Sequence, residues 1–270
     1  MPQMSRVAVL LDCDNVGHVW AKGILAEAAR QGTLSVKRGY GDWTSPHLTG
    51  WRAELPGHAI QPIQQFAWVA GKNATDSALI IDAMDLLYSG NLDVFYLVSS
   101  DSDFTRLAVR LRESGKTVYG IGARHTPEAF RNACDRFTYL DVLPGQQDSP
   151  APMLSQNGSS AATATDAQTP EPSKPTAGAA PEAVQPVPVK MILAAVDAAA
   201  KDDGWALLAN VGHYIVNTDP TFDSRNFGYA KLSNLAANVP GIETQLKPDA
   251  NQINQTWVRR ASAVMGGTPS

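Results

Sequence analysis

Apolar and polar residues follow two recurring patterns in the first half of the chain. Short apolar runs are typical of buried strands, and longer segments with apolar residues three and four positions apart are typical of helices. The pattern predicts strands at residues 6–12, 34–40, 59–66, 93–98 and 117–122, and helices at residues 17–31, 46–55, 74–89, 103–114 and 126–134. Strands that alternate with helices favour an α/β fold, doubly wound, with a parallel sheet and helices on both faces.

The pattern changes between Pro144 and Pro188. This segment is rich in Pro, Ala, Ser, Thr and Gln and has almost no large apolar residues. Such a composition buries too little apolar surface to offset the entropy lost on ordering. We therefore expect an N-terminal domain over residues 1–144, a disordered linker over 145–187, a C-terminal domain over 188–262 and a disordered tail over 263–270.

The C-terminal block has a different order of elements. Helix patterns near residues 189–201, 207–217 and 228–238 precede two short strand candidates, GIETQL and QTWVRR. This order is typical of a winged helix-turn-helix. Phe222 and Phe227 are expected in its core.

Acidic residues follow the two most apolar strand candidates of the N-terminal block. Asp12 and Asp14 end the first, and Asp101 and Asp103 follow the fourth. The carboxyl ends of parallel strands line the crevice where ligands bind, so the two pairs should meet there. Two carboxylates 4 Å apart repel by about 4 kcal/mol at an effective dielectric of about 20. Helix capping by Ser100, Ser102 or Asp103 would account for at most one of these groups.

A third source of negative charge is Asp76. Apolar residues at helical spacing follow it, so Asp76 falls in the first turn of its helix on the buried stripe. Helix capping by Thr75 or Asp76, typically worth about 1 kcal/mol, is the simpler reading for an acid at this position. The alternative is a metal site, because a divalent cation would offset the repulsion among Asp12, Asp76, Asp101 and Asp103.

The candidate ligands of this site are all oxygen donors. Such sites suit Mg²⁺ or Mn²⁺, which keep water ligands and accept phosphate oxygens. The indicated chemistry is metal-dependent phosphodiester hydrolysis, with nucleic acid as the expected substrate. The formal net charge of −4 gives no bulk attraction for a polyanion, so a local patch or the metal would have to meet it.

The N-terminal apolar stretch and the two cysteines add little to the prediction of function. The apolar stretch from Val7 to Leu11 is too short for a signal peptide core or a membrane span, so we expect a cytoplasmic protein that does not bind membranes. Cys13 and Cys134 lack the spacing of a zinc site and are expected to be packing residues.

The motifs LLDCDNVG, GKNATDSALIIDAMDLL and YLVSSDSDFTRLAVRLRESGKTVYGIG, followed by ACDRFTYL, resemble the NYN domain of the PIN-like nuclease superfamily over residues 6 to 141. The resemblance implies a PIN-like, Rossmann-like sheet and a ribonuclease that uses Mg²⁺ or Mn²⁺. By position, it assigns the metal and the catalysis to Asp12, Asp76, Asp101 and Asp103. It further matches Asn15 to a catalytic-site asparagine, expected to orient Asp12 or a water.

The C-terminal block resembles a LOTUS domain, also called OST-HTH, over about residues 187 to 260. The resemblance implies binding of RNA or of a protein partner. Arg225, Tyr229 and Lys231 cluster near the third helix and are candidates for RNA contact, with Tyr229 either stacking on a base or packing in the core. In the N-terminal block, Lys72 and Arg124 are the corresponding candidates.

Three functions remain open at this stage. The first is an endoribonuclease whose LOTUS domain selects RNA, and the second is a non-catalytic RNA-binding or adaptor protein that retains the acids. The third is a Rossmann-type nucleotide binder, but the first strand is followed by DCDN and not by a GxGxxG turn.

Overall fold

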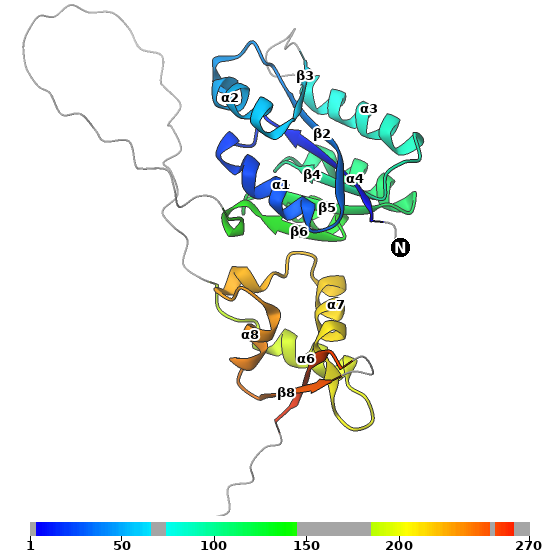
Figure 1. Ribbon diagram of the computed structural model, residues 1–270, viewed down its shortest axis with the longest axis vertical. Coiled ribbons are helices and arrows are strands. Elements are labelled where there is room, and N and C mark those ends of the chain that lie inside the picture. The colour runs from blue at the N-terminus through cyan, green and yellow to red at the C-terminus, as the bar shows by residue number, and fades with distance from the viewer. Residues whose placement is uncertain (1–3, 66–73, 145–184, 249–251, 262–270) are drawn as a thin grey trace, which may run out of the picture.

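The computed structural model describes residues 4–65, 74–144, 185–248 and 252–261. An N-terminal α/β domain and a smaller C-terminal domain are visible in Figure 1. Most of the predicted linker and the predicted tail lie outside the described residues, so both stay predictions.

The N-terminal domain is built on a six-stranded parallel sheet with the strand order β3-β2-β1-β4-β5-β6. The strands are β1 (Arg6–Asp12), β2 (Thr33–Gly41), β3 (Gln61–Gln64), β4 (Val94–Val98), β5 (Thr117–Gly122) and β6 (Arg136–Tyr139). The predicted α/β class is confirmed. The sixth strand was not predicted, and it pairs with β5 at the edge of the sheet.

Helices cover both faces of this sheet. One face packs on α1 (Ala21–Ala29) and α2 (Thr49–His58), and the other packs on α3 (Ala74–Tyr88), α4 (Thr105–Glu113) and α5 (Glu128–Ala133). Single 3-10 turns precede three of these helices: η1 (His18–Trp20), η2 (Pro46–Leu48) and η3 (Ser102–Phe104). A further turn, η4 (Leu140–Val142), follows β6. Within the described parts of the chain, no helix is both long and apolar enough to span a bilayer.

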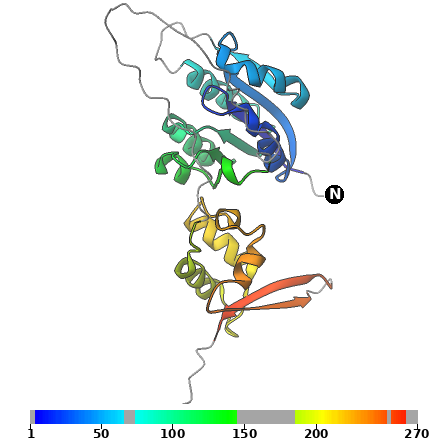
Figure 2. The same ribbon diagram turned by 90° about the vertical axis from the view of Figure 1, so that its left-hand side faces the viewer.

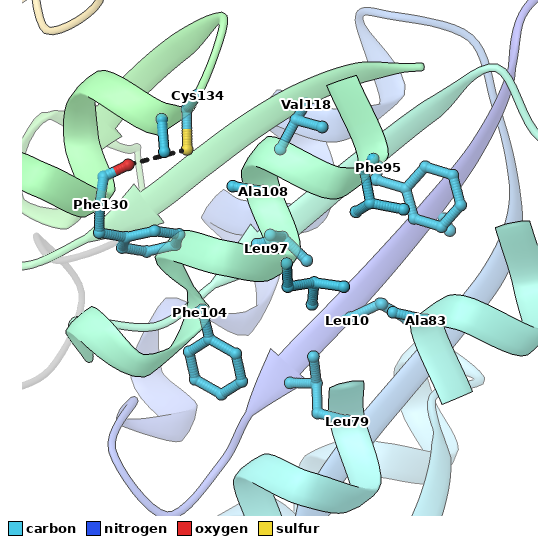
Figure 3. Packing of buried hydrophobic residues seen from close by; sticks show 14 of the residues in the cluster. Leu10, Leu79, Ala83, Phe95, Leu97, Phe104, Ala108, Val118, Phe130 and Cys134 are labelled. Atoms are coloured by element: carbon cyan, nitrogen blue, oxygen red, sulfur yellow. Dashed lines mark hydrogen bonds between the residues drawn. The ribbon is translucent and has the colours of Figure 1, made fainter. Parts of the chain in front are cut away.

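Alternation along β1 divides the core into two layers. Ala8 and Leu10 face α3 and α4, whereas Val7, Val9 and Leu11 face α1 and α2. Figure 3 shows the first layer, where side chains from β1, β4 and β5 meet those of α3, α4 and α5. Successive strand residues point to opposite faces of the sheet. The side chain of Asp12, two positions after Leu10, therefore points to the face that α3 covers.

The C-terminal domain has the predicted winged helix-turn-helix order. Its elements are α6 (Val189–Ala199), β7 (Ala206–Leu207), α7 (Leu208–Thr218), the turn η6 (Ser224–Phe227), α8 (Leu232–Ala237), β8 (Ile242–Pro248) and β9 (Asn254–Arg260). The strands form an antiparallel sheet in the order β7-β9-β8. Figure 2 shows the hairpin of β8 and β9 extending away from the helices. Phe222 and Phe227 are buried in the core, as predicted, with ring centroids 5.6 Å apart.

A chain of ion pairs, in which the carboxylates of Glu27 and Asp223 are buried, joins the two domains. Glu27 in the last turn of α1 accepts hydrogen bonds from Arg225 at 2.9 and 3.2 Å. Arg225 also donates to Asp223, and Asp223 accepts from Arg136 at 2.7 Å. The backbone N–H of Phe137 on β6 donates to the carbonyl of Pro220 at 2.8 Å. These contacts lie toward the amino ends of the strands, since Arg136 begins β6.

Candidate metal centre

The acidic residues gather where the order of the sheet reverses. Strands β1 and β4 are neighbours at the centre, and the chain leaves them toward opposite edges. In open α/β sheets this reversal opens a crevice at the carboxyl ends of the strands. The ends of β1 and β4 and the first turn of α3 bring Asp12, Asp101, Asp103 and Asp76 to this place.

Three of the acids form a close group. Carboxylate oxygens of Asp76, Asp101 and Asp103 lie within 4.8 Å of one another, although they come from α3, the end of β4 and the start of η3. Asp76 is buried, Asp101 is half-buried and Asp103 is exposed, so the group opens to solvent on one side. A divalent cation with oxygen ligands at about 2.1 Å spans ligand atoms up to about 4.2 Å apart, so binding would need at most a small closing movement of this group.

The helix cap next to this group differs from the prediction. Asp101 is the N-cap of η3, and its side chain accepts a hydrogen bond from the backbone N–H of Asp103 at 2.9 Å. The prediction of a cap at Ser100, Ser102 or Asp103 was wrong, because Asp101 keeps extended backbone while the next residue enters the turn. One oxygen of Asp101 therefore positions the loop.

Asp12 is fully buried beside this group. Its Oδ2 accepts hydrogen bonds from Asn15 Nδ2 at 2.8 Å and from Ser99 Oγ at 2.6 Å. Its Oδ1 is buried and has no hydrogen-bond partner among the described residues. Burial raises the pKa of Asp12, and the two hydrogen bonds oppose this rise. An unpaired buried carboxylate oxygen is costly unless a cation or a proton neutralises it.

Burial and neighbouring negative charges raise the pKa of Asp76. It is raised to about 6, first by burial and then by the negative charges of Asp12, Asp101, Asp103 and Asp14. Asp12 therefore acts electrostatically on Asp76. At pH 7 the carboxylate would be largely ionised, as a metal ligand must be.

Contacts to β2 fix the helix that carries Asp76. Tyr40, which is fully buried, donates its hydroxyl to Asp82 on α3, and Arg38 forms an ion pair with the same carboxylate. Burial, followed by the hydrogen bond and charge of Asp82, raises the pKa of Tyr40, so its hydroxyl stays a donor. Asp82 lies on the same helix as Asp76, six positions later. These two contacts therefore hold the helix that carries Asp76 against β2.

Asp14 occupies the rim of the site. The hydroxyl of Thr75 donates to Asp14 at 2.8 Å, which joins the start of α3 to the loop after β1. Asp14 is exposed, and it contributes to the raised pKa of Asp76 without joining the close group.

The structure adds a candidate site residue, Ser99, that the sequence did not indicate. Ser99 is buried, donates to Asp12 and accepts the backbone N–H of Asp101 at 3.1 Å, so one hydroxyl joins both acidic strand ends. Gly122 leaves room for this strand end, because a Cβ there would lie 2.5 Å from the carbonyl oxygen of Ser99. The signal in the sequence was a serine at the end of a wholly apolar strand.

A cavity of about 320 Å³ opens next to the acids. Its lining is polar and comes from three loops: Asn15, Ser100, Asp101, Ser102, His125 and Pro127. Sites for small ligands begin at about this size. The cavity lies at the carboxyl edge of the sheet and gives a ligand access to Asp101.

Two of the predicted RNA-contact residues belong to the N-terminal domain. Lys72 lies outside the described residues. Arg124 binds Asp141 at 2.7 Å and stacks over the ring of Tyr139.

The other three candidates belong to the C-terminal domain. Arg225 lies in the contact between the domains, Tyr229 is half-buried against the C-terminal core, and Lys231 is exposed at the start of α8. Burial alone would raise the pKa of Asp223, but Arg225 and Arg136 together hold it below its ordinary value.

Two protein families match this chain. The NYN domain matches residues 6–141, and the OST-HTH/LOTUS domain matches residues 181–253. No curated protein matches the chain.

Three solved structures are similar to parts of the chain. A protein of unknown function from Vibrio parahaemolyticus is 19% identical with a TM-score of 0.44, and the match covers 52% of this chain and 94% of that one. An uncharacterised protein from Nitrosomonas europaea is 31% identical with a TM-score of 0.30, covering 40% of this chain and 100% of that one. A protein from Chromobacterium violaceum is 26% identical with a TM-score of 0.24, covering 33% of this chain and 100% of that one.

Proposed function

This chain belongs to the NYN domain family and also carries an OST-HTH/LOTUS domain, and from that premise we propose that it is a metal-dependent endoribonuclease. The two families support a nuclease and RNA-binding role. The main support for a metal-dependent endoribonuclease is the group of three carboxylates within 4.8 Å of one another, beside the buried oxygen of Asp12 that has no hydrogen-bond partner among the described residues. We propose that the substrate is RNA and that the reaction is phosphodiester hydrolysis.

The proposed ligands of Mg²⁺ or Mn²⁺ are Asp12, Asp76, Asp101 and Asp103. When bound, the ion would lower the pKa of a water ligand and neutralise charge on the phosphate. The donor set fits such an ion because it consists of carboxylate oxygens, one of them buried without a partner.

The residues around the ligands have distinct roles in this proposal. Asn15 and Ser99 hold Asp12 by its Oδ2, so its Oδ1, which has no hydrogen-bond partner among the described residues, would be available to the ion. Asp101 uses one oxygen to hold the loop, so its other oxygen is available to the ion. The exposed side of the group, next to the cavity lined by His125, is where we place the RNA backbone.

The C-terminal domain selects RNA in this proposal. Its tether to the nuclease domain raises the local concentration of bound RNA near the acids. The acids lie at the carboxyl ends of the strands and the domain contact lies toward the amino ends. A bound RNA strand therefore passes along the N-terminal domain to reach the acids.

The test is cleavage of linear and circularised single-stranded RNA with Mg²⁺, Mn²⁺ or EDTA. Circular RNA has no ends, so its cleavage requires an endonuclease. We expect cleavage with a metal and none with EDTA. Asp101→Asn should remove activity without unfolding the protein, because asparagine caps a helix as well as aspartate does.

Asp85→Asn is the matched control. Asp85 is exposed on α3, the helix that carries Asp76, and lies outside the acidic group, so this variant should cleave normally. If the wild-type protein binds the RNA tightly but never cleaves it with either metal, the non-catalytic RNA-binding function replaces the nuclease.

A further inference from the structure

The C-terminal sheet carries a row of aromatic and basic side chains on its outer side. Lys201 lies 5.1 Å from the ring centre of Trp257, and Lys247 lies 5.5 Å from the same ring. Lys247 also lies 4.6 Å from the ring centre of Trp205, whose ring is 4.7 Å from the guanidinium of Arg259. We call these five residues the tryptophan face.

Strand alternation explains why this face is turned outward. Val258 on β9 is fully buried in the core of the C-terminal domain, so its neighbours Trp257 and Arg259 point to the opposite side. Ala206 on β7 pairs with Val258 and is also fully buried, which turns the preceding Trp205 outward. Both tryptophans stay partly exposed.

The charges on this face are unbalanced. Glu243 is the one acid among the described residues that pairs with it, and it accepts a hydrogen bond from Arg259 at 2.8 Å. The two lysines have no acidic partner within ion-pair distance in the described parts of the chain, and each lies instead over an indole ring. Their positive charge is therefore open to an anion.

We propose that the tryptophan face binds single-stranded RNA. Single-stranded nucleic acid supplies planar bases that stack on aromatic rings and phosphates that meet cations, and both requirements are met in this row. On binding, a base takes the place of a lysine over an indole ring, and the displaced ammonium group contacts the neighbouring phosphate. Charge complementarity favours RNA here over an uncharged protein surface.

A hollow between the sheet and α8 is lined by a residue already proposed to contact RNA. A cavity of about 400 Å³ is lined by Leu207 and Gln255 of the sheet and by Lys231 at the start of α8. An RNA strand on the tryptophan face can therefore continue toward α8. The inference rests on the proposed function and specifies where the C-terminal domain holds its RNA.

The experiment measures RNA binding separately from cleavage. The full chain carrying Asp101→Asn is titrated, in EDTA, into a fluorescein-labelled oligouridine of about 12 nucleotides, a length within the range of single-strand sites. Fluorescence anisotropy then gives Kd for this protein and for versions that also carry Trp257→Ala, Lys247→Ala or Lys190→Ala. Lys190 is an exposed lysine on α6 of the same domain and is the control.

We expect Trp257→Ala to weaken binding roughly 10-fold, because one stacked base is lost. Lys247→Ala should weaken binding and reduce the slope of log K against log salt by about 0.7, the value for one contact to single-stranded phosphate. Lys190→Ala should leave Kd unchanged. Trp257→Phe keeps an aromatic ring and should retain most of the affinity, which separates stacking from a loss of folding.

Unchanged RNA affinity in both Trp257→Ala and Lys247→Ala would overturn the inference and leave this face to a protein partner. That outcome differs from a failure of the proposed nuclease function, in which the protein would bind RNA and not cleave it, because binding is measured here in EDTA and does not depend on cleavage.

Discussion

Replacing Asp76 with asparagine should make the metal-free protein more stable while removing its response to metal. The carboxylate of Asp76 is 8% exposed and is surrounded by the charges of Asp12, Asp101 and Asp103. Asparagine has the same shape without the charge. The variant therefore relieves repulsion that only a cation would otherwise relieve.

The pKa shift gives the size of the effect. A rise of the pKa from the ordinary 3.8 to about 6 corresponds to about 3 kcal/mol at 1.36 kcal/mol per unit. The group opens to solvent at Asp103, and screening by water and salt reduces this to about 1–2 kcal/mol.

The direction with pH follows from linkage. Between pH 3.8 and about 6, the folded protein holds a proton on Asp76 that the unfolded chain has lost. The free energy of unfolding therefore falls as pH rises through this window and stays low above it. The advantage of Asp76→Asn should be largest above pH 6 and should shrink as the pH falls below it.

Thermal denaturation at about pH 8, with EDTA and then with Mn²⁺, tests this reasoning. In EDTA we expect the Tm of Asp76→Asn to exceed that of the wild type by roughly 3–8 °C. At a Mn²⁺ concentration near 100 times Kd, the wild type should gain about 2.7 kcal/mol and the variant little, so their order reverses. Asp85→Asn should follow the wild type in both conditions. An Asp76→Asn protein that is less stable than the wild type in EDTA at this pH would refute the argument.

Further predictions concern the surroundings of the site and the domain contact. Arg225→Ala removes the closer of the two cations that pair with the buried Glu27 and leaves only Arg30, at 3.5 Å, which should cost up to about 3 kcal/mol and increase the radius of gyration measured by small-angle X-ray scattering; an unchanged radius would contradict the contact. Ser99→Ala removes a hydrogen bond to Asp12 and should weaken Mn²⁺ affinity by at least about 10-fold in calorimetric titration; equal affinity would exclude a positioning role. Phe130→Ala should lower the free energy of unfolding in urea by about 3–5 kcal/mol, because its ring is fully buried in the core; a loss below 1 kcal/mol would show that the core collapses around the gap.

Hydrophobic patterning predicted the centre of the sheet because β1, β4 and β5 are apolar and largely buried. Strands β1 and β5 begin and end at the predicted residues, and α3 ends within one residue of its prediction. Strand β6 has only four residues and begins with Arg136, so it lacks an apolar run of its own. Its conformation depends on pairing with β5 and on a hydrogen bond to the other domain.

The positions of the acids at the strand ends could be predicted from the sequence, whereas the hydrogen bonds of each carboxylate could not. Topology alone brings residues at the ends of β1 and β4 together, which is why Asp12 and Asp101 could be predicted to meet. The cap at Asp101 and the unpaired Oδ1 of Asp12 depend on side-chain rotation within about one ångström, which no sequence pattern specifies.

The role of Arg225 was beyond sequence reasoning for another reason. Its partner Glu27 is 198 positions away, and neither residue has a spacing that points to the other. An arginine near a helix-turn-helix suggests nucleic acid, and only the folded chain shows a carboxylate in that place.

The buried pair of Glu27 and Arg225 also bears on how such proteins can be recombined. A helix-turn-helix domain grafted from another protein, with an uncharged residue at the position of Arg225, would leave the buried Glu27 with only Arg30, at 3.5 Å, as a counter-charge. A second substitution in the nuclease domain, for example Glu27→Gln, should then restore the stability of the domain contact in such a chimera. The two domains are therefore expected to be inherited and exchanged as a matched set, even though a long segment of chain separates them in the sequence.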